Sequence, residues 1–380
     1  MNSEPIKKVC FIGAGTMGCF NSLMASVAGY ECVIYDPLKE SLASRKKNQK
    51  AMGEFLSHSN FFNGVDIATS ISKIKNESNL INALAGAHLI SESIPENFDL
   101  KIKVLKEVES LVSNNAILTT NTSSLSVTRM SQQLNPVTNF AAMHFHLGSR
   151  LIDLVRGVNT SEATIKSLVA FVESINGHPL VLKKESPGYA LNAMLGGLFR
   201  QSMLMVIEGL YSIEEIDGAW KELNKSEFGP FGMMDIFGLD VVKGAWDEKE
   251  EGSSHIIYKE KILGLLSKYT SNESLGMKTG KGFYDYSKVQ NEHEKSNYID
   301  IQKDLRIGII ESALVLLADD ILEKDQINKA WIVGMLVEQG PFDIFNAIGV
   351  KEFKKQYKEW LSNLYISSEN SQKISKLINY

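Results

Sequence analysis

A glycine cluster near the start of the chain, Gly13-Ala14-Gly15-Thr16-Met17-Gly18, limits the possible folds more than any other segment. An apolar run of β-favouring residues, 7–12, precedes it, and a segment with helical character, 19–28, follows it. In such a strand–turn–helix unit, the first glycine permits a tight turn, the second lets a pyrophosphate approach the backbone, and the third lets the helix pack on the strand. The N–H groups of the helix N-terminus would face the phosphates. The cluster therefore predicts a dinucleotide-binding Rossmann unit.

A second predicted strand, 32–35, ends on an acidic residue, Asp36. A carboxylate at this position accepts hydrogen bonds from the adenosine ribose and repels a 2′-phosphate, which favours NAD over NADP. Glycine-rich turns occur in many folds, but here strand, turn, helix, second strand and acidic residue follow in the order that the motif requires. The residues expected to bind the cofactor NAD are Gly13, Gly15, Thr16, Met17, Gly18 and Asp36.

Strand-like and helix-like segments continue to alternate through the first part of the chain. Further predicted strands cover 87–93, 116–119 and 139–144. This order is typical of an α/β protein with a doubly wound parallel sheet, in which ligands bind at the carboxyl ends of the strands. Ser123 follows one of these strands and His144 ends another, so we expect both side chains to face the cofactor.

The rest of the chain consists of long helical segments that contain an internal repeat. Residues Ile216, Ala219, Trp220, Gly229, Pro230, Phe231 and Gly238 recur, with a constant offset and no gap, as Ile327, Ala330, Trp331, Gly340, Pro341, Phe342 and Gly349. We expect two related helical units in tandem, with the tryptophans as core residues. The predicted domains are a Rossmann domain over 1–185, a helical domain over 186–287 and a second, truncated helical copy over 300–380, with a polar linker at 287–296.

Composition and charge exclude several classes of protein. The formal net charge is −5 and the basic residues are scattered, so we expect no nucleic-acid partner. No apolar stretch approaches the length of a membrane span, and the N-terminus lacks a signal-peptide pattern, so we expect no membrane contact and a cytoplasmic location. Because Cys10, Cys19 and Cys32 show no metal-ligand spacing, we expect reduced core cysteines and no metal site.

Further motifs, taken with the glycine cluster, resemble the 3-hydroxyacyl-CoA dehydrogenase family over about residues 7–287. These motifs are Pro95-Glu96-Asn97, Asn121-Thr122-Ser123-Ser124-Leu125, His144-Phe145, Ser186-Pro187-Gly188, Asn192, Gly229-Pro230-Phe231 and Lys278-Thr279-Gly280-Lys281-Gly282-Phe283-Tyr284. The resemblance implies an NAD-dependent enzyme that oxidises the L-3-hydroxyl of an acyl thioester, or runs the reverse reduction. The acyl group would be carried by CoA or by a carrier protein.

The resemblance also implies roles for single residues. His144 would be the general acid/base, and an imidazole suits this role because it titrates near neutral pH. Ser123 and Asn192 would hydrogen-bond the substrate oxygen, as in an oxyanion hole. The positions that match cofactor contacts are Glu96, Lys101 and Asn121.

One segment departs from the family pattern. In the family the histidine lies in His-Phe-Phe-Asn-Pro, and a glutamate twelve residues on orients it. Here the segment reads His144-Phe145-His146-Leu147-Gly148, and the position twelve residues on is Arg156. Arginine has no acceptor and, near His144, would lower the pKa of the imidazole. Asp153 would supply the missing carboxylate if the local register shifts. In a strand over 151–155, the side chains of Asp153 and Arg156 point to opposite faces. His146 is either a second wall of the site or a plain substitution.

These departures leave several readings open beside the ordinary dehydrogenase. Arg156 would favour an anionic or carrier-bound substrate if it lies in the pocket, and it has no such meaning if it lies on the surface. A silent NAD-binding homologue is the non-enzymatic alternative. The presence of Ser123, His144 and Asn192 together favours an enzyme. Single-copy family members dimerise through the helical domain, and relatives with two copies mimic the partner, so the resemblance implies a monomer or a homodimer.

Overall fold

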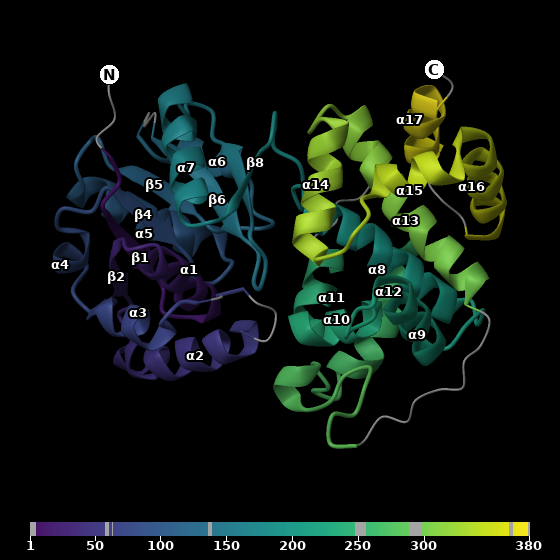
Figure 1. Cartoon of the computed structure of the whole chain (residues 1–380), viewed down its shortest axis with the longest axis horizontal. Helices are drawn as coiled ribbons and strands as arrows, with labels where there is room; N and C mark the ends of the chain where they lie inside the picture. The colour runs from purple at the N-terminus through teal and green to yellow at the C-terminus, as the bar shows by residue number, and fades with distance from the viewer. Residues whose placement is uncertain are drawn as a thin grey trace. The chain divides into compact units, whose positions relative to one another are not determined.

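The computed structural model describes residues 5–57, 61–62, 64–135, 139–247, 256–288, 298–364 and 368–378, and most of the predicted linker lies outside this set. The chain divides into two compact units, residues 1–189 with 333–335, and residues 190–332 with 336–380. In Figure 1 all labelled strands lie in the purple-to-teal part of the chain, and the green-to-yellow part carries helices. None of the helices in the described ranges is long and apolar enough to cross a membrane.

The first unit is built on an eight-stranded sheet with the order β3-β2-β1-β4-β5-β6-β7-β8. The strands are β1 Lys8–Ile12, β2 Glu31–Tyr35, β3 Lys75–Glu77, β4 Leu89–Glu92, β5 Ile117–Thr120, β6 Phe140–Phe145, β7 Leu151–Arg156 and β8 His178–Val181. Among these strands every neighbouring pair is parallel except β6 and β7. The central strands are buried along almost their whole length, which explains why they read as continuous apolar runs.

Helices connect the parallel strands of this sheet. They are α1 Thr16–Val27, α2 Lys39–Ser57, α3 Ile67–Lys73, α4 Leu80–Leu84, α5 Phe98–Leu111, α6 Val127–Gln133 and α7 Glu162–Ser174. The chain order reverses at β1, because β2 lies on one side of β1 and β4 on the other. In doubly wound sheets the crevice at such a reversal holds the ligand. The glycine turn that follows β1 lies at this point.

The β6–β7 hairpin gives the sheet its antiparallel pair. Phe145 lies opposite Ile152, and His144 lies opposite Asp153. The turn between the two strands is only five residues long (146–150). Side chains of directly opposite residues share a sheet face, so this register brings the side chains of His144 and Asp153 together.

The second unit is helical, apart from the short 3₁₀ helix η1 Met277–Thr279 and its glycine-rich turn. Its helices are α8 Leu191–Ile207, α9 Ile213–Asn224, α10 Pro230–Phe237, α11 Leu239–Asp247, α12 Ile256–Thr270, α13 Ile299–Ala318, α14 Lys324–Met335, α15 Pro341–Ile348, α16 Val350–Leu364 and α17 Ser368–Ile378, with residues 333–335 of α14 grouped with the first unit. An α/β fold with an N-terminal Rossmann sheet followed by helices is therefore confirmed.

Structural details recur in the helical unit at the offset of the sequence repeat. This offset is 111 residues, the same separation as between Arg200 and Glu311, which form a hydrogen bond. Both α9 and α14 end on a left-handed residue, Lys225 with φ 51° and Leu336 with φ 56°. The helices that follow, α10 and α15, each begin with proline after a glycine. Asp217 accepts a hydrogen bond from the N–H of Phe231 at 2.8 Å, and Asn328 does the same for Phe342 at 2.8 Å. These shared details support the proposal of two tandem helical copies.

Candidate active site

The glycine turn after β1 has the backbone geometry that a dinucleotide site needs. Gly13 has φ 100°, and a Cβ there would meet the carbonyl oxygen of Ser93 at 2.7 Å. A Cβ on Gly18 would meet the carbonyl oxygen of Gly13 at 1.8 Å, so α1 approaches β1 only because this residue lacks a side chain. A Cβ on Gly15 would meet no heavy atom within 4 Å, which leaves open space beside the turn. Phosphate oxygens fit such space.

The N-terminus of α1 and the end of β2 complete this part of the site. Gly15, the residue before α1, makes no side-chain cap hydrogen bond, and the first turn that follows, with Thr16 and Met17, contains no acidic residue. An anion at this helix end would therefore meet N–H groups and no like charge. Asp36 accepts hydrogen bonds from the N–H of Ala14 at 2.8 Å and of Leu38 at 2.9 Å. The carboxylate thus lies directly beside the glycine turn. These residues fit the adenosine and pyrophosphate of NAD.

Glu96 and Lys101 form a supporting network at the ends of β4 and β5. The buried ammonium of Lys101 lies 2.6 Å from Glu92 Oε1 and 3.3 Å from Glu96 Oε2. Glu96 Oε1 accepts the N–H groups of Ser123 at 3.0 Å and of Ser124 at 3.2 Å. Burial alone would raise the pKa of Glu96, but the charge of Lys101 and these hydrogen bonds lower it. The network holds the loop that carries Ser123.

Asn121, at the end of β5, links neighbouring elements. Its side-chain oxygen accepts hydrogen bonds from Asn21 Nδ2 of α1 at 3.2 Å and from the N–H of Phe145 of β6 at 2.9 Å. Asn121 therefore ties the helix after the glycine turn to the strand that carries His144. Its predicted contact with the cofactor stays a prediction.

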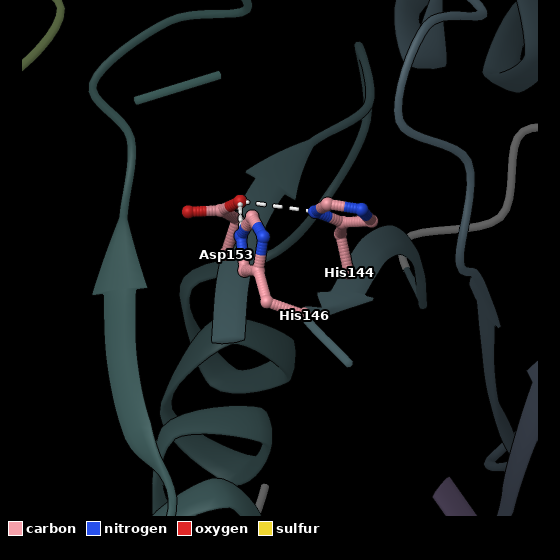
Figure 2. Close-up of side chains that lie close together, drawn as sticks. All are labelled: His144, His146 and Asp153. Carbon is pink, nitrogen blue, oxygen red and sulfur yellow. Dashed lines mark hydrogen bonds and ion pairs between the residues drawn. The ribbon is translucent and has the colours of Figure 1, made fainter. Parts of the chain in front are cut away.

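Two histidines share one oxygen of Asp153 (Figure 2). His144 Nδ1 lies 3.0 Å and His146 Nε2 lies 2.7 Å from the same atom, Asp153 Oδ2. All three residues are buried, with exposed fractions of 6%, 9% and 0% for His144, His146 and Asp153. An ionised carboxylate only accepts hydrogen bonds, so both nitrogens donate. The neutral His144 ring then carries its proton on Nδ1 and leaves the Nε2 lone pair as a base.

The electrostatics of this cluster follow from burial and from the two rings. Burial alone would raise the pKa of Asp153, but the charge of His146 and the hydrogen bonds from both histidines lower it to about 2. Burial lowers the pKa of His144, and His146 lowers it further, against the opposing effect of Asp153. Asp153 is thus held as the anion and His144 as the neutral imidazole.

The cluster's short distances are those of hydrogen bonds. The candidate ligand atoms of His144, His146 and Asp153 lie within 4.8 Å of one another. A shared tetrahedral ion would keep its nitrogen and oxygen ligands ~3.3 Å apart, whereas the two N–O separations here are 2.7 and 3.0 Å. A nitrogen that donates its proton to a carboxylate does not coordinate a cation. The expected absence of a metal stays a prediction.

Arg156 does not occupy the place of the family's glutamate, and the expectation that it does so is wrong. It is the last residue of β7 and lies opposite Ala141, not opposite His144. Its side chain is 32% exposed and pairs with Glu162 at 2.6 Å. Asp153 provides the carboxylate nine residues after His144, because the short hairpin turn brings it into register. A partly exposed guanidinium that pairs with Glu162 gives no support to the reading of Arg156 as an anion-binding group in the pocket.

A cavity of about 530 Å³ lies within the first unit between segments 123–128 and 184–189. Ser123 lines this cavity. Tyr189 lines it too, donates a hydrogen bond from its hydroxyl to the carbonyl of Thr122 at 3.0 Å, and places its ring edge-on to His144 at 5.4 Å. The tyrosine was not singled out in the sequence, although it directly follows the Ser-Pro-Gly motif. Asn192 is the second residue of α8 in the helical unit, and its contact with a substrate stays a prediction.

Comparisons with known proteins match both the Rossmann part and the first helical part of the chain. The NAD binding domain of 3-hydroxyacyl-CoA dehydrogenase matches residues 8–186, and the C-terminal domain of 3-hydroxyacyl-CoA dehydrogenase matches residues 188–286. A probable 3-hydroxyacyl-CoA dehydrogenase of Caenorhabditis elegans is 31% identical over 295 residues, which covers 75% of this chain and 97% of that protein. The mitochondrial hydroxyacyl-coenzyme A dehydrogenase of Sus scrofa is 28% identical, covering 74% of this chain and 91% of that protein.

Solved structures extend the likeness to the fold. The crystal structure of (S)-3-hydroxybutyryl-CoA dehydrogenase from Ralstonia eutropha is 28% identical, with a TM-score of 0.64 over 74% of this chain and 100% of that chain. The crystal structure of 3-hydroxybutyryl-CoA dehydrogenase from Escherichia coli is 16% identical, with a TM-score of 0.79 over 98% of both chains. This second fold match includes the residues beyond 287. The matches confirm the predicted NAD-binding domain. They show that the chain belongs to the 3-hydroxyacyl-CoA dehydrogenase family.

Proposed function

We propose that this protein interconverts an L-3-hydroxyacyl-CoA and its 3-oxoacyl-CoA with NAD, using His144 as the acid/base. The observation that carries this assignment is the buried His144–Asp153 hydrogen bond of 3.0 Å at the carboxyl end of β6, inside an NAD-binding domain. The relatives named above are dehydrogenases of hydroxyacyl-CoA and hydroxybutyryl-CoA, which supports CoA as the carrier. The contacts of the described residues add no support for a carrier protein or an anionic acyl group.

The cofactor is held by the glycine turn and the elements beside it. The turn 13–18 and the N-terminus of α1 would bind the pyrophosphate, and the carboxylate of Asp36 would accept hydrogen bonds from the ribose. Glu96 would contact the cofactor from the loop after β4. The ammonium of Lys101 is buried against Glu92 and Glu96, so we infer that it acts by holding Glu96.

The reaction needs one base and one group to hold the substrate oxygen. When bound, NAD accepts the hydride that leaves C3 of the hydroxyacyl group. His144 Nε2 takes the hydroxyl proton, so the C–O bond gains double-bond character while the imidazole becomes charged. Asp153 stabilises this imidazolium and fixes its orientation. Ser123 and Asn192 would donate hydrogen bonds to the substrate oxygen. In the reverse reduction His144 returns the proton.

The test is to follow NADH absorbance with acetoacetyl-CoA as the substrate. The native protein is expected to turn over, and His144→Ala is expected to lose about 10²- to 10⁴-fold in kcat, the usual contribution of a general acid/base. NADH binding, measured by fluorescence, serves as the control and should be unchanged in the variant. Full activity of His144→Ala, or no turnover of any acyl-CoA by the native protein that still binds NADH, would contradict the assignment.

We also propose that the protein is a monomer in which α13–α17 take the place that a second subunit would take against α8–α12. Three pairs of equivalent positions contact each other: Gly197 with Gly308, Arg200 with Glu311, and Trp220 with Trp331. A residue that touches its own equivalent is the signature of a two-fold arrangement. Light scattering is expected to give the mass of one chain, and a tight dimer would contradict this. The predicted cytoplasmic location stays a proposal as well.

A further inference from the structure

We propose that His146 is a positioning residue that sets the pH range in which His144 accepts the substrate proton, because both rings depend on one oxygen of Asp153. This inference rests on the proposed dehydrogenase function. The family pattern has phenylalanine at the position of His146, so the second histidine is a feature of this chain.

The geometry makes the two histidines competitors for the same acceptor. The rings of His144 and His146 meet edge-on, with centroids 4.4 Å apart. Both N–H groups point at Asp153 Oδ2, and the second oxygen, Asp153 Oδ1, is buried without a hydrogen-bond partner among the described residues. The carboxylate therefore has two imidazoles on one oxygen. An oxygen that serves two donors stabilises each of them less than an oxygen that serves one.

The charges around His144 allow one extra proton more easily than two. Asp153 faces it from β7, His146 from β6, and Tyr189 from the segment before α8, and the charge of Glu96 acts on it from the loop after β4. With one proton added to the histidine pair, the cluster is neutral. With two, it carries a net positive charge in a buried site, which costs much more. The neighbouring ring of His146 therefore opposes protonation of His144.

The sign of the effect on catalysis follows from the role of His144. Oxidation of the hydroxyacyl group needs the neutral imidazole, and reduction of the oxoacyl group needs the imidazolium. His146 disfavours the imidazolium of His144. The pH range of oxidation therefore extends further towards acid, and the pH range of reduction shrinks at its alkaline end. The equilibrium constant of the reaction is unchanged, since that belongs to the substrates and not to the enzyme.

The experiment measures kcat/KM against pH in both directions for the native protein and His146→Phe. With His146 removed, Asp153 serves His144 alone, and the acid limb of 3-hydroxybutyryl-CoA oxidation is expected to move up by about one pH unit. On that limb the oxidation rate falls about tenfold. The basic limb of acetoacetyl-CoA reduction moves up by a similar amount, so the variant reduces faster than the native protein at alkaline pH.

The variant His146→Gln and the NMR titration of His144 provide two further measurements. His146→Gln keeps an N–H donor for Asp153 but cannot take a proton, so its limb is expected to move by less than that of His146→Phe. The NMR titration of the His144 ring in the NAD-free protein should shift in parallel and needs no activity. Unchanged pH limbs and an unchanged His144 titration in both variants would overturn the inference. If His144→Ala itself stays fully active, the proposed function fails instead.

Discussion

At the scale of single residues, the identity and position of one carboxylate decide the chemistry of the site. Asp153 is fully buried, accepts from His144 and lies directly opposite it in the hairpin. A carboxylate in this position fixes the tautomer of the imidazole and stabilises the charge that forms during turnover. The pair of His144 and Asp153 therefore has the arrangement that the proposed acid/base role needs, although its spacing in the sequence differs from the family pattern.

Replacing Asp153 tests this directly. In Asp153→Asn the amide donates a hydrogen bond, so His144 turns its lone pair towards residue 153 and its proton towards the substrate. We expect kcat for acetoacetyl-CoA reduction and hydroxyacyl oxidation to fall by about 10³- to 10⁴-fold, with little change in NADH affinity. Asp153→Glu, which keeps the charge, is the matched control and should retain far more activity. Equal losses in both variants would show that packing, not the carboxylate, matters at this position.

Arg156 provides the opposite prediction. Because its guanidinium is partly exposed and pairs with Glu162 at 2.6 Å, Arg156→Ala should leave kcat and KM nearly unchanged. The free energy of unfolding should fall by about 1 kcal/mol or less, as for other partly exposed ion pairs. Steady-state kinetics and urea unfolding check both points. A large rise in KM for acyl-CoA would return Arg156 to the substrate site.

At the scale of elements, the strand–turn–helix unit at β1 and α1 contains one glycine needed for packing and another that faces open space. Gly18 lets α1 pack on β1, since a Cβ there would lie 1.8 Å from the carbonyl oxygen of Gly13. Gly15 has ordinary backbone angles, with φ −72°, and open space beyond its Cα. Gly18 is therefore required by the packing of α1 on β1, whereas the open space at Gly15 suits the proposed approach of a phosphate.

The two glycines therefore predict different outcomes for the same substitution. Gly15→Ala should keep the native Tm but weaken NADH binding by about tenfold or more, because a methyl group fills the space of the pyrophosphate. Gly18→Ala should lower the Tm and NADH affinity together, because α1 must move away from β1. Thermal unfolding and NADH fluorescence titrations check the pair. A Gly15→Ala protein with native NADH affinity would place the pyrophosphate elsewhere.

At the scale of the whole chain, contacts inside the helical unit fit the proposal of two packed copies of one pattern. Trp220 and Trp331 meet edge-on, with centroids 6.3 Å apart. The buried ion pair joins Arg200 of α8 to Glu311 of α13, which occupy equivalent positions in the two copies. Two identical subunits would place like charges at these positions. Arginine in one copy and glutamate in the other therefore favour packing within one chain over pairing of two chains.

Charge exchange at this pair tests the arrangement. Glu311→Arg should lower the free energy of unfolding by about 3–5 kcal/mol, since it buries two like charges. Adding Arg200→Glu to that variant should restore part of the loss, because opposite charges again meet at the two positions. Urea unfolding of the native protein, the single variants and the double variant forms a complete cycle. Additive losses would show that Arg200 and Glu311 do not interact.

Local patterns in the sequence determined the Rossmann unit and the helical repeat, because these features depend on residues that are close in the chain. The turn at 13–18, the acidic residue after β2 and the repeat of Trp220 as Trp331 each depend on neighbours in the chain or on a constant offset. The motif His144-Phe145 and its resemblance to the family pattern likewise predicted His144 as the acid/base.

Only the tertiary structure decided which carboxylate reaches His144. A hairpin's register depends on the length of its turn, and the five-residue turn 146–150 brings Asp153 opposite His144 and carries Arg156 past it. The sharing of Asp153 by two histidines follows from the same register, and no spacing along the chain shows it.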